Sequence, residues 1–199
     1  MQYSYLALGD SYTIGEAVLL AESFPYQLVQ LLRSHKMEIA APEIIAKTGW
    51  TTDELHSAIV QTNFLKKYDF VSLLIGVNNQ YREKPIDNFE SEFEELLKKA
   101  IGFANNKSTH VFILSIPDWG VTTFAKDRDI NKIAVEINAY NEMCKKITLK
   151  YKCTFLDITT AQRSDSNNAE MVAADGLHPS ALEYSKWAKM LAHVILGNI

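Results

Sequence analysis

The chain has 199 residues, of which 47% are hydrophobic and 22% are charged, and its formal net charge is −4. This length can bury a core that needs no metal or disulfide, so we expect one domain over residues 1–199. The basic residues are scattered along the chain, which argues against nucleic acid or an anionic membrane as a partner.

Targeting signals and cysteine patterns add little to this picture. Met1-Gln2-Tyr3 runs directly into an apolar segment without a basic region, so we expect no signal peptide and a cytoplasmic protein. No apolar run approaches the ~20 residues of a membrane span, which predicts no stable membrane insertion. Cys144 and Cys153 fit neither a metal-binding spacing nor a disulfide framework, so both are expected in the core.

The first half of the chain alternates between strand and helix patterns. Residues 5–8 form an apolar segment of strand length that ends at Gly9. Ser23 and Pro25 mark the start of a helix whose apolar positions run to residue 32. Residues 44–46 predict a second strand, and residues 51–54 form a capping box that begins the second helix. Residues 70–75 are almost continuously apolar, as in a strand covered on both faces.

The same alternation continues to the end of the chain. Residues 87–103 predict a helix that is acidic first and basic later, which suits the helix dipole. Residues 111–114 and 154–156 predict two more strands, and residues 163–168 a polar loop. We expect a helix over 131–150 and a last helix with Pro179 in its first turn. The 131–150 helix is supported by the apolar residues Ile133, Val135, Ile137, Tyr140, Met143 and Ile147.

Five strands that alternate with helices predict an α/β fold, with a five-stranded parallel sheet between two helical layers. In such a sheet the carboxyl ends of the strands share one edge, where ligands bind. Polar or glycine-rich segments follow the strands at that edge. These segments are Gly9-Asp10-Ser11, Gly49, Gly76-Val77-Asn78, the 117–124 loop, and the turn from Asp175 to His178.

This set of groups matches what acyl transfer requires. Neutral His178 can accept the proton of the Ser11 hydroxyl and so activate it as a nucleophile. Asp175 stands three residues earlier in a tight turn, where it can hold the other ring nitrogen. The Ser11 and Gly49 backbone N–H groups and the Asn78 side chain are candidate donors for an oxyanion hole.

These motifs resemble the SGNH, or GDSL-type, serine hydrolase superfamily, from Gly9-Asp10-Ser11-Tyr12 to the Asp175–Pro179 segment. The resemblance implies a flavodoxin-like three-layer α/β/α fold and no metal or organic cofactor. It also implies Ser11 as nucleophile, His178 as base, Asp175 as its partner, and an oxyanion hole from Ser11, Gly49 and Asn78.

The chain departs from the family pattern at two positions. Tyr12 stands where leucine is common, and Asn79 stands where aspartate is usual. Both changes are expected to alter the pocket or the support behind Asn78. The candidate substrate-binding residues are Asp10, Tyr12, Trp50, Asn79, Tyr81, Trp119, Phe124 and Met171.

The sequence therefore predicts a serine esterase or acylhydrolase that cleaves small-molecule carboxylic esters through an acyl-Ser11 intermediate. Family resemblance extends the expected substrates to thioesters and lysophospholipids. Two alternatives stay open, namely a carbohydrate acetylesterase that uses the same site and a non-catalytic flavodoxin-like binding module. The oligomeric state is also open.

Overall fold

The computed structural model describes residues 2–197. Its centre is a five-stranded parallel sheet in the order β2-β1-β3-β4-β5. This order is that of flavodoxin-like folds, and it confirms the predicted sheet. The strands are β1 (Tyr5–Asp10), β2 (Glu43–Lys47), β3 (Phe70–Leu74), β4 (Val111–Leu114) and β5 (Thr154–Leu156).

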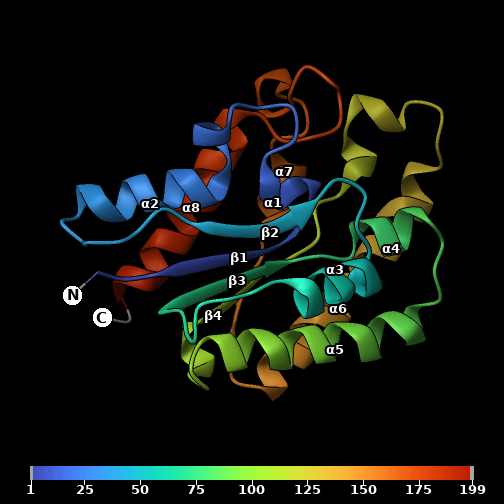
Figure 1. Ribbon diagram of the computed structural model, residues 1–199. Helices are drawn as coiled ribbons and strands as arrows, with labels where there is room; N and C mark the ends of the chain where they lie inside the picture. Colours follow the sequence, from blue (N-terminus) through green and yellow to red (C-terminus); the bar gives the residue numbers. More distant parts are fainter. Residues whose placement is uncertain (1, 198–199) are drawn as a thin grey trace.

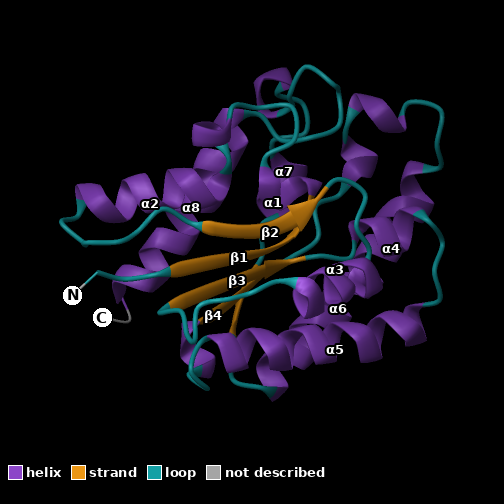
Figure 2. Ribbon diagram, in the orientation of Figure 1, coloured by secondary structure: helices purple, strands orange, loops and turns teal. Residues whose placement is uncertain are grey.

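Helices cover both faces of the sheet and complete three α/β/α layers (Figures 1 and 2). Helix α2 pairs with α8 on one face, and α5 packs beside α3 and α6 on the other. Three short helices, α1, α4 and α7, follow strand ends. The helices are α1 (Ser11–Ile14), α2 (Phe24–Ser34), α3 (Thr52–Gln61), α4 (Val77–Tyr81), α5 (Ile86–Phe103), α6 (Ile130–Lys150), α7 (Thr159–Ser164) and α8 (Ala181–Gly197).

The apolar stripes of the long helices face the core, but one apolar residue of α6 faces solvent. In α6 the side chains of Ile133 and Ile137 are buried, but Val135 is 68% exposed. Val135 follows Ile133 by two positions, about 200° around the helix, so the two residues cannot share a face. Both Cys144 and Cys153 are buried, as expected, and burial raises the pKa of the Cys153 thiol to about 11.

The short helices and the start of α8 differ from the prediction. Helices of four to six residues contain too few turns for a periodic pattern, so α1, α4 and α7 were not predicted. Helix α7 includes Arg163, which the sequence pattern places in a polar loop over residues 163–168. Pro179 precedes α8 instead of lying in its first turn. The Ser180 hydroxyl accepts the Glu183 backbone N–H there, at 3.3 Å.

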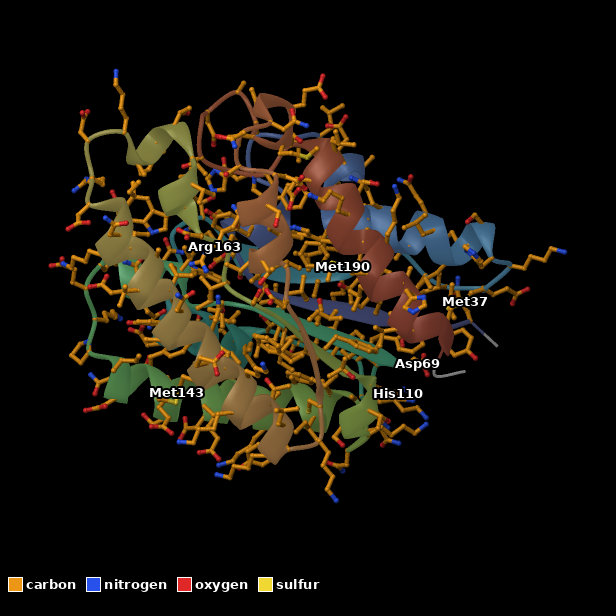
Figure 3. All side chains as sticks on the ribbon, turned by 180° about the vertical axis from the view of Figure 1, so that it is seen from behind. Met37, Asp69, His110, Met143, Arg163 and Met190 are labelled. Atoms are coloured by element: carbon orange, nitrogen blue, oxygen red, sulfur yellow. The ribbon has the colours of Figure 1, made fainter. Side chains whose placement is uncertain are left out.

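The strand register places the predicted site segments at one edge. Gly9 pairs with Ala46 of β2 and Leu74 of β3, so these three strands end at the same height. The chain order reverses between β1 and β3, which in this fold opens a ligand-binding crevice at the carboxyl ends of the strands. Asp69 and His110 lie at the other end of the sheet (Figure 3). Within residues 2–197, no helix has the length and apolar character needed to cross a membrane.

Candidate active site

A cavity of about 150 Å³ opens at the carboxyl ends of β1, β2 and β3. It brings together residues that are up to 167 positions apart in the chain, from Ser11 to His178. Of the predicted catalytic and oxyanion-hole residues, all but Asp175 line it, and Asp175 lies behind His178. The lining residues are Ser11, Tyr12, Thr48, Gly49, Val77, Asn78, Tyr81, Trp119, Phe124, Leu177 and His178.

Close packing at the end of β1 determines where Ser11 lies. A Cβ atom on Gly9 would lie 2.1 Å from Thr13 Oγ1 and 2.4 Å from the Leu74 carbonyl oxygen, so only glycine fits there. The Asp10 carboxylate accepts the Tyr12 backbone N–H at 3.0 Å and caps α1, of which Ser11 is the first residue. The chain thus turns sharply from strand to helix and presents Ser11 to the cavity.

The turn from Asp175 to His178 holds the imidazole in a single orientation. Asp175 Oδ2 lies 2.6 Å from His178 Nδ1, and Oδ1 accepts the backbone N–H groups of Leu177 and His178 at 3.0 Å each. Burial raises the pKa of Asp175, but these hydrogen bonds outweigh it and hold the pKa below its usual value. Asp175 is therefore an anion that favours a proton on Nδ1 and leaves Nε2 as the basic nitrogen.

The ring of His178 and the Ser11 hydroxyl face the same cavity, although no hydrogen bond joins them in the described part of the chain. The Tyr12 ring packs against His178 with 5.1 Å between the ring centroids. Burial, followed by the charges of Asp10, Asp175 and Asp118, raises the pKa of the Tyr12 phenol. Tyr12 is thus a neutral aromatic wall beside the imidazole.

Asn78 and Gly49 line the same cavity as Ser11. Asn78 Nδ2 donates to the Trp50 carbonyl at 2.9 Å and makes a longer contact, 3.4 Å, with Asp10 Oδ2. Burial raises the pKa of the Asp10 carboxyl to about 7, although the hydrogen bonds from Tyr12 and Asn78 oppose this shift. Gly49 has a φ of +83°, a conformation that favours glycine, and its carbonyl accepts a hydrogen bond from Arg82.

Four of the predicted substrate-binding residues line the cavity, and four do not. Tyr12, Tyr81, Trp119 and Phe124 line it, and the last three pack together with ring centroids 5.3–6.3 Å apart. Asp10 lies beneath the cavity as the cap of α1.

The other three predicted substrate-binding residues do not line this cavity. Asn79 is fully buried and pairs with Thr52, accepting its N–H at 3.1 Å and donating to its hydroxyl at 2.6 Å. Adjacent residues of the short helix α4 point in different directions, so Asn78 faces the cavity while Asn79 ties α4 to the start of α3. The Trp50 side chain packs on the core. Met171 lines a separate cavity of about 10 Å³, which His178 also borders.

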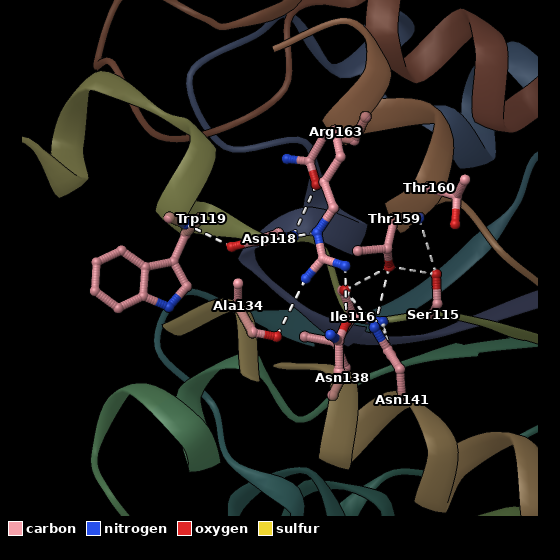
Figure 4. A network of polar contacts seen from close by, with 12 residues as sticks. Ser115, Ile116, Asp118, Trp119, Ala134, Asn138, Asn141, Thr159, Thr160 and Arg163 are labelled. Carbon is pink, nitrogen blue, oxygen red and sulfur yellow. Dashed lines mark hydrogen bonds and ion pairs between the residues drawn. The ribbon is translucent and has the colours of Figure 1, made fainter. Parts of the chain in front are cut away.

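A polar network supports the Trp119 wall of the cavity (Figure 4). Asp118 is 1% exposed, and its carboxylate accepts Arg163 Nε at 2.8 Å and the Gly120 backbone N–H at 2.8 Å. Its own backbone N–H donates to Gln162 at 2.8 Å. The network therefore ties the loop after β4 to α7 and fixes the backbone on both sides of Trp119.

Several residues of the site are not marked by a sequence motif of their own. Thr48, Val77 and Leu177 line the cavity, and each adjoins a predicted site residue, so chain position was the available signal. No sequence signal pointed to Arg163, which acts across 45 residues. Among the residues that the structure describes, no group of three or more His, Cys, Asp or Glu side chains could hold a metal ion.

Comparisons with known proteins identify the family and the fold. The profile of the GDSL-like lipase/acylhydrolase family matches residues 7–185. A lipase/acylhydrolase from Enterococcus faecalis is 20% identical, with a TM-score of 0.74 over 98% of this chain and 96% of that one. An acetylxylan esterase from Geobacillus stearothermophilus is 18% identical, with a TM-score of 0.75 over 97% and 94%. At these identities both structures support the fold alone. No curated protein sequence matches the chain.

Proposed function

Since the chain belongs to the GDSL-like lipase/acylhydrolase family and is a serine ester hydrolase, we propose that it cleaves carboxylic esters through an acyl-Ser11 intermediate. One observation carries this proposal. His178, whose Nδ1 lies 2.6 Å from Asp175 Oδ2, lines the same cavity as Ser11.

The reaction follows from these positions. Ser11 Oγ attacks the ester carbonyl carbon while His178 Nε2 takes the hydroxyl proton, and Asp175 stabilises the imidazolium. The tetrahedral intermediate collapses as the alcohol leaves with that proton. Water, activated by the same nitrogen, then attacks the acyl-enzyme and releases the carboxylic acid and free Ser11.

The backbone N–H groups of Ser11 and Gly49 and the side chain of Asn78 are the proposed oxyanion donors. One hydrogen of the Asn78 amide is held by the Trp50 carbonyl at 2.9 Å, which orients the group. The other makes only the 3.4 Å contact with Asp10, so an oxyanion can replace that contact. Preorganised donors of this kind stabilise charge that appears only in the transition state.

The cavity size favours a short acyl group. Its volume of about 150 Å³ is below the ~300–1,000 Å³ typical of small-molecule sites. An acetyl to butyryl group fits this space between Tyr81, Trp119 and Phe124. A long acyl chain, as in a lysophospholipid, would extend beyond it, so we rank short-chain esters above lysophospholipids and long-chain thioesters.

Labelling with a fluorophosphonate probe tests the nucleophile directly. The wild-type protein should gain one adduct by intact mass, and Ser11→Ala should gain none. Ser91→Ala, which removes a hydroxyl that donates to the Asn88 carbonyl on the exposed side of α5, is the matched control and should label like the wild type. A folded wild-type protein that gives no adduct would refute the proposal and favour a binding module.

A series of p-nitrophenyl esters tests the acyl preference. The value of kcat/KM should be highest between acetyl and butyryl and should fall by at least about tenfold by octanoyl, because the longer chain leaves the cavity. A steady rise to palmitoyl would show that the acyl group occupies a different surface and would support the lipid alternative.

A further inference from the structure

The aromatic ring of Tyr12 lies directly beside the imidazole of the active site. Its side chain is 2% exposed, and its ring centroid lies 5.1 Å from that of His178, with 53° between the ring planes. This separation is within the ~6 Å over which an aromatic ring attracts a cation. Leucine is common at this position in the family pattern, so the aromatic contact belongs to this chain and not to the shared motif.

Helix α8 holds the Tyr12 ring in place from the other side. The ring stacks on that of Trp187, with 6.5 Å between the centroids and 28° between the planes. Trp187 Nε1 in turn donates to Glu183 Oε1 at 2.9 Å, and both of these residues are 1% exposed. Tyr12 is therefore fixed against His178 by packing on a side chain that is itself buried and hydrogen-bonded.

The groups around the imidazole differ in charge. The titratable groups that border it are Asp175 of its own turn, Tyr12 of α1, Asp165 just after α7 and Glu183 of α8. Lys186 pairs with both Asp165 and Glu183. Asp10, beneath α1, contacts Asn78 instead. Burial, followed by nearby carboxylates, raises the pKa of the Tyr12 phenol, so Tyr12 is neutral. Exchanging Tyr12 for another neutral side chain therefore tests the ring without removing a charge.

We propose that Tyr12 is a positioning residue of the hydrolase, and that its ring stabilises the imidazolium form of His178. This inference rests on the proposed acyl-Ser11 chemistry, in which His178 takes the hydroxyl proton and passes it to the leaving alcohol. The positive charge on the imidazole develops in the transition state, so its attraction to the ring lowers the barrier without tightening substrate binding. A leucine side chain fills space but offers no such attraction.

Two substitutions of Tyr12 separate the ring from the hydroxyl. Tyr12→Phe keeps the ring, whereas Tyr12→Leu removes it. With p-nitrophenyl acetate, Tyr12→Leu should lower kcat by about 3- to 30-fold, as expected for the loss of one cation–π contact, with KM little changed. Tyr12→Phe should keep kcat within about twofold of the wild type, because the ring face remains. If Tyr12→Leu does not fold, Tyr12→Met provides the same comparison.

A ¹⁵N NMR titration of the His178 ring provides a readout that a packing role would not give. A ring that stabilises the imidazolium delays its loss of the proton, so the titration midpoint of Tyr12→Leu should lie about 0.5–1.5 pH units below that of the wild type. Loss of packing alone would admit water, which solvates the cation and moves the midpoint upward. Tyr12→Phe should titrate like the wild type.

Tyr3→Leu is the matched control. It also removes a stacked tyrosine ring, which packs on Phe70 with 5.6 Å between the centroids, but this pair lies at the start of β3, away from the site. Both kcat and the His178 midpoint should stay at the wild-type values in this variant.

An unchanged or higher midpoint in Tyr12→Leu would overturn the proposal, and so would a fall in kcat shared equally by Tyr12→Phe. A change confined to KM would show that Tyr12 contacts substrate only and would also overturn it. A wild-type protein without a fluorophosphonate adduct would refute the acyl-Ser11 chemistry and the role of Tyr12 in it. Normal labelling of the wild type with an unchanged midpoint in Tyr12→Leu would refute the role of Tyr12 alone.

Discussion

The buried ion pair between Asp118 and Arg163 provides the sharpest test of how the cavity wall is held. The Asp118 side chain is 1% exposed and the Arg163 side chain 30%, with 2.8 Å between Oδ2 and Nε. Arg163 also donates to Asn138 at 2.7 Å and to the Ala134 carbonyl at 3.3 Å (Figure 4). Substitution of Arg163→Met keeps much of the side-chain volume but leaves the Asp118 carboxylate without its counter-ion.

The expected cost follows from that burial. Breaking a buried ion pair by removing one partner destabilises proteins by about 3–5 kcal/mol. Because Arg163 is partly exposed, we expect the lower end, roughly 3 kcal/mol. For a protein of this size each kcal/mol lowers Tm by about 2–4 °C, so Arg163→Met should lower Tm by about 6–12 °C. Thermal and urea unfolding measure this loss.

Two further variants test whether the stability lost in Arg163→Met comes from the uncompensated charge of Asp118. Lys146→Met breaks an exposed pair with Glu90 and should cost less than about 1 kcal/mol. Adding Asp118→Asn to Arg163→Met removes the uncompensated charge and should recover part of the stability. The ion pair is not the source of this stability if Arg163→Met changes Tm no more than Lys146→Met, or if Asp118→Asn lowers the stability of Arg163→Met further. Arg163→Met should also reduce kcat/KM, since the backbone next to Trp119 loses its support.

The remaining predictions concern catalysis and pH. Asp175→Asn keeps an acceptor for the backbone N–H groups but no longer favours the productive tautomer of His178. The value of kcat should therefore fall by about 10³–10⁴-fold while the circular dichroism spectrum stays unchanged. A fall in kcat of less than tenfold would argue against a catalytic role of the Asp175–His178 pair. Asn78→Ala should reduce kcat by about 10²–10³-fold with little change in KM, and an effect confined to KM would contradict an oxyanion role. Burial raises the pKa of Asp10 to about 7 from 3.8, so the folded protein retains a proton that the unfolded chain loses above pH 4. The contribution of that proton to the free energy of unfolding is complete below pH 4 and is lost as the pH rises to 7, by up to roughly 4 kcal/mol. In urea unfolding at pH 4–8, Asp10→Asn should remove this decrease of the free energy of unfolding with pH. An unchanged decrease would show that Asp10 is ionised throughout.

Local sequence patterns are sufficient to predict the strands and long helices and to name the candidate catalytic residues. The strands and long helices follow from hydrophobic periodicity, which reflects how each segment buries one face or both. The site motifs could be placed because parallel strands bring their carboxyl ends to one edge, so a linear order of motifs predicts their neighbours in space. Ser11, Gly49, Asn78 and His178 meet in one cavity for that reason.

The tertiary structure alone decided the direction of individual side chains and the contacts between distant segments. Asn78 and Asn79 are adjacent and chemically identical, yet one faces the cavity and the other is buried against Thr52, because α4 turns between them. The Asp118–Arg163 pair and the contact between the Tyr12 and His178 rings join segments far apart in sequence. Such contacts depend on how helices pack on the sheet, and a sequence pattern of polar residues does not record which of them will meet.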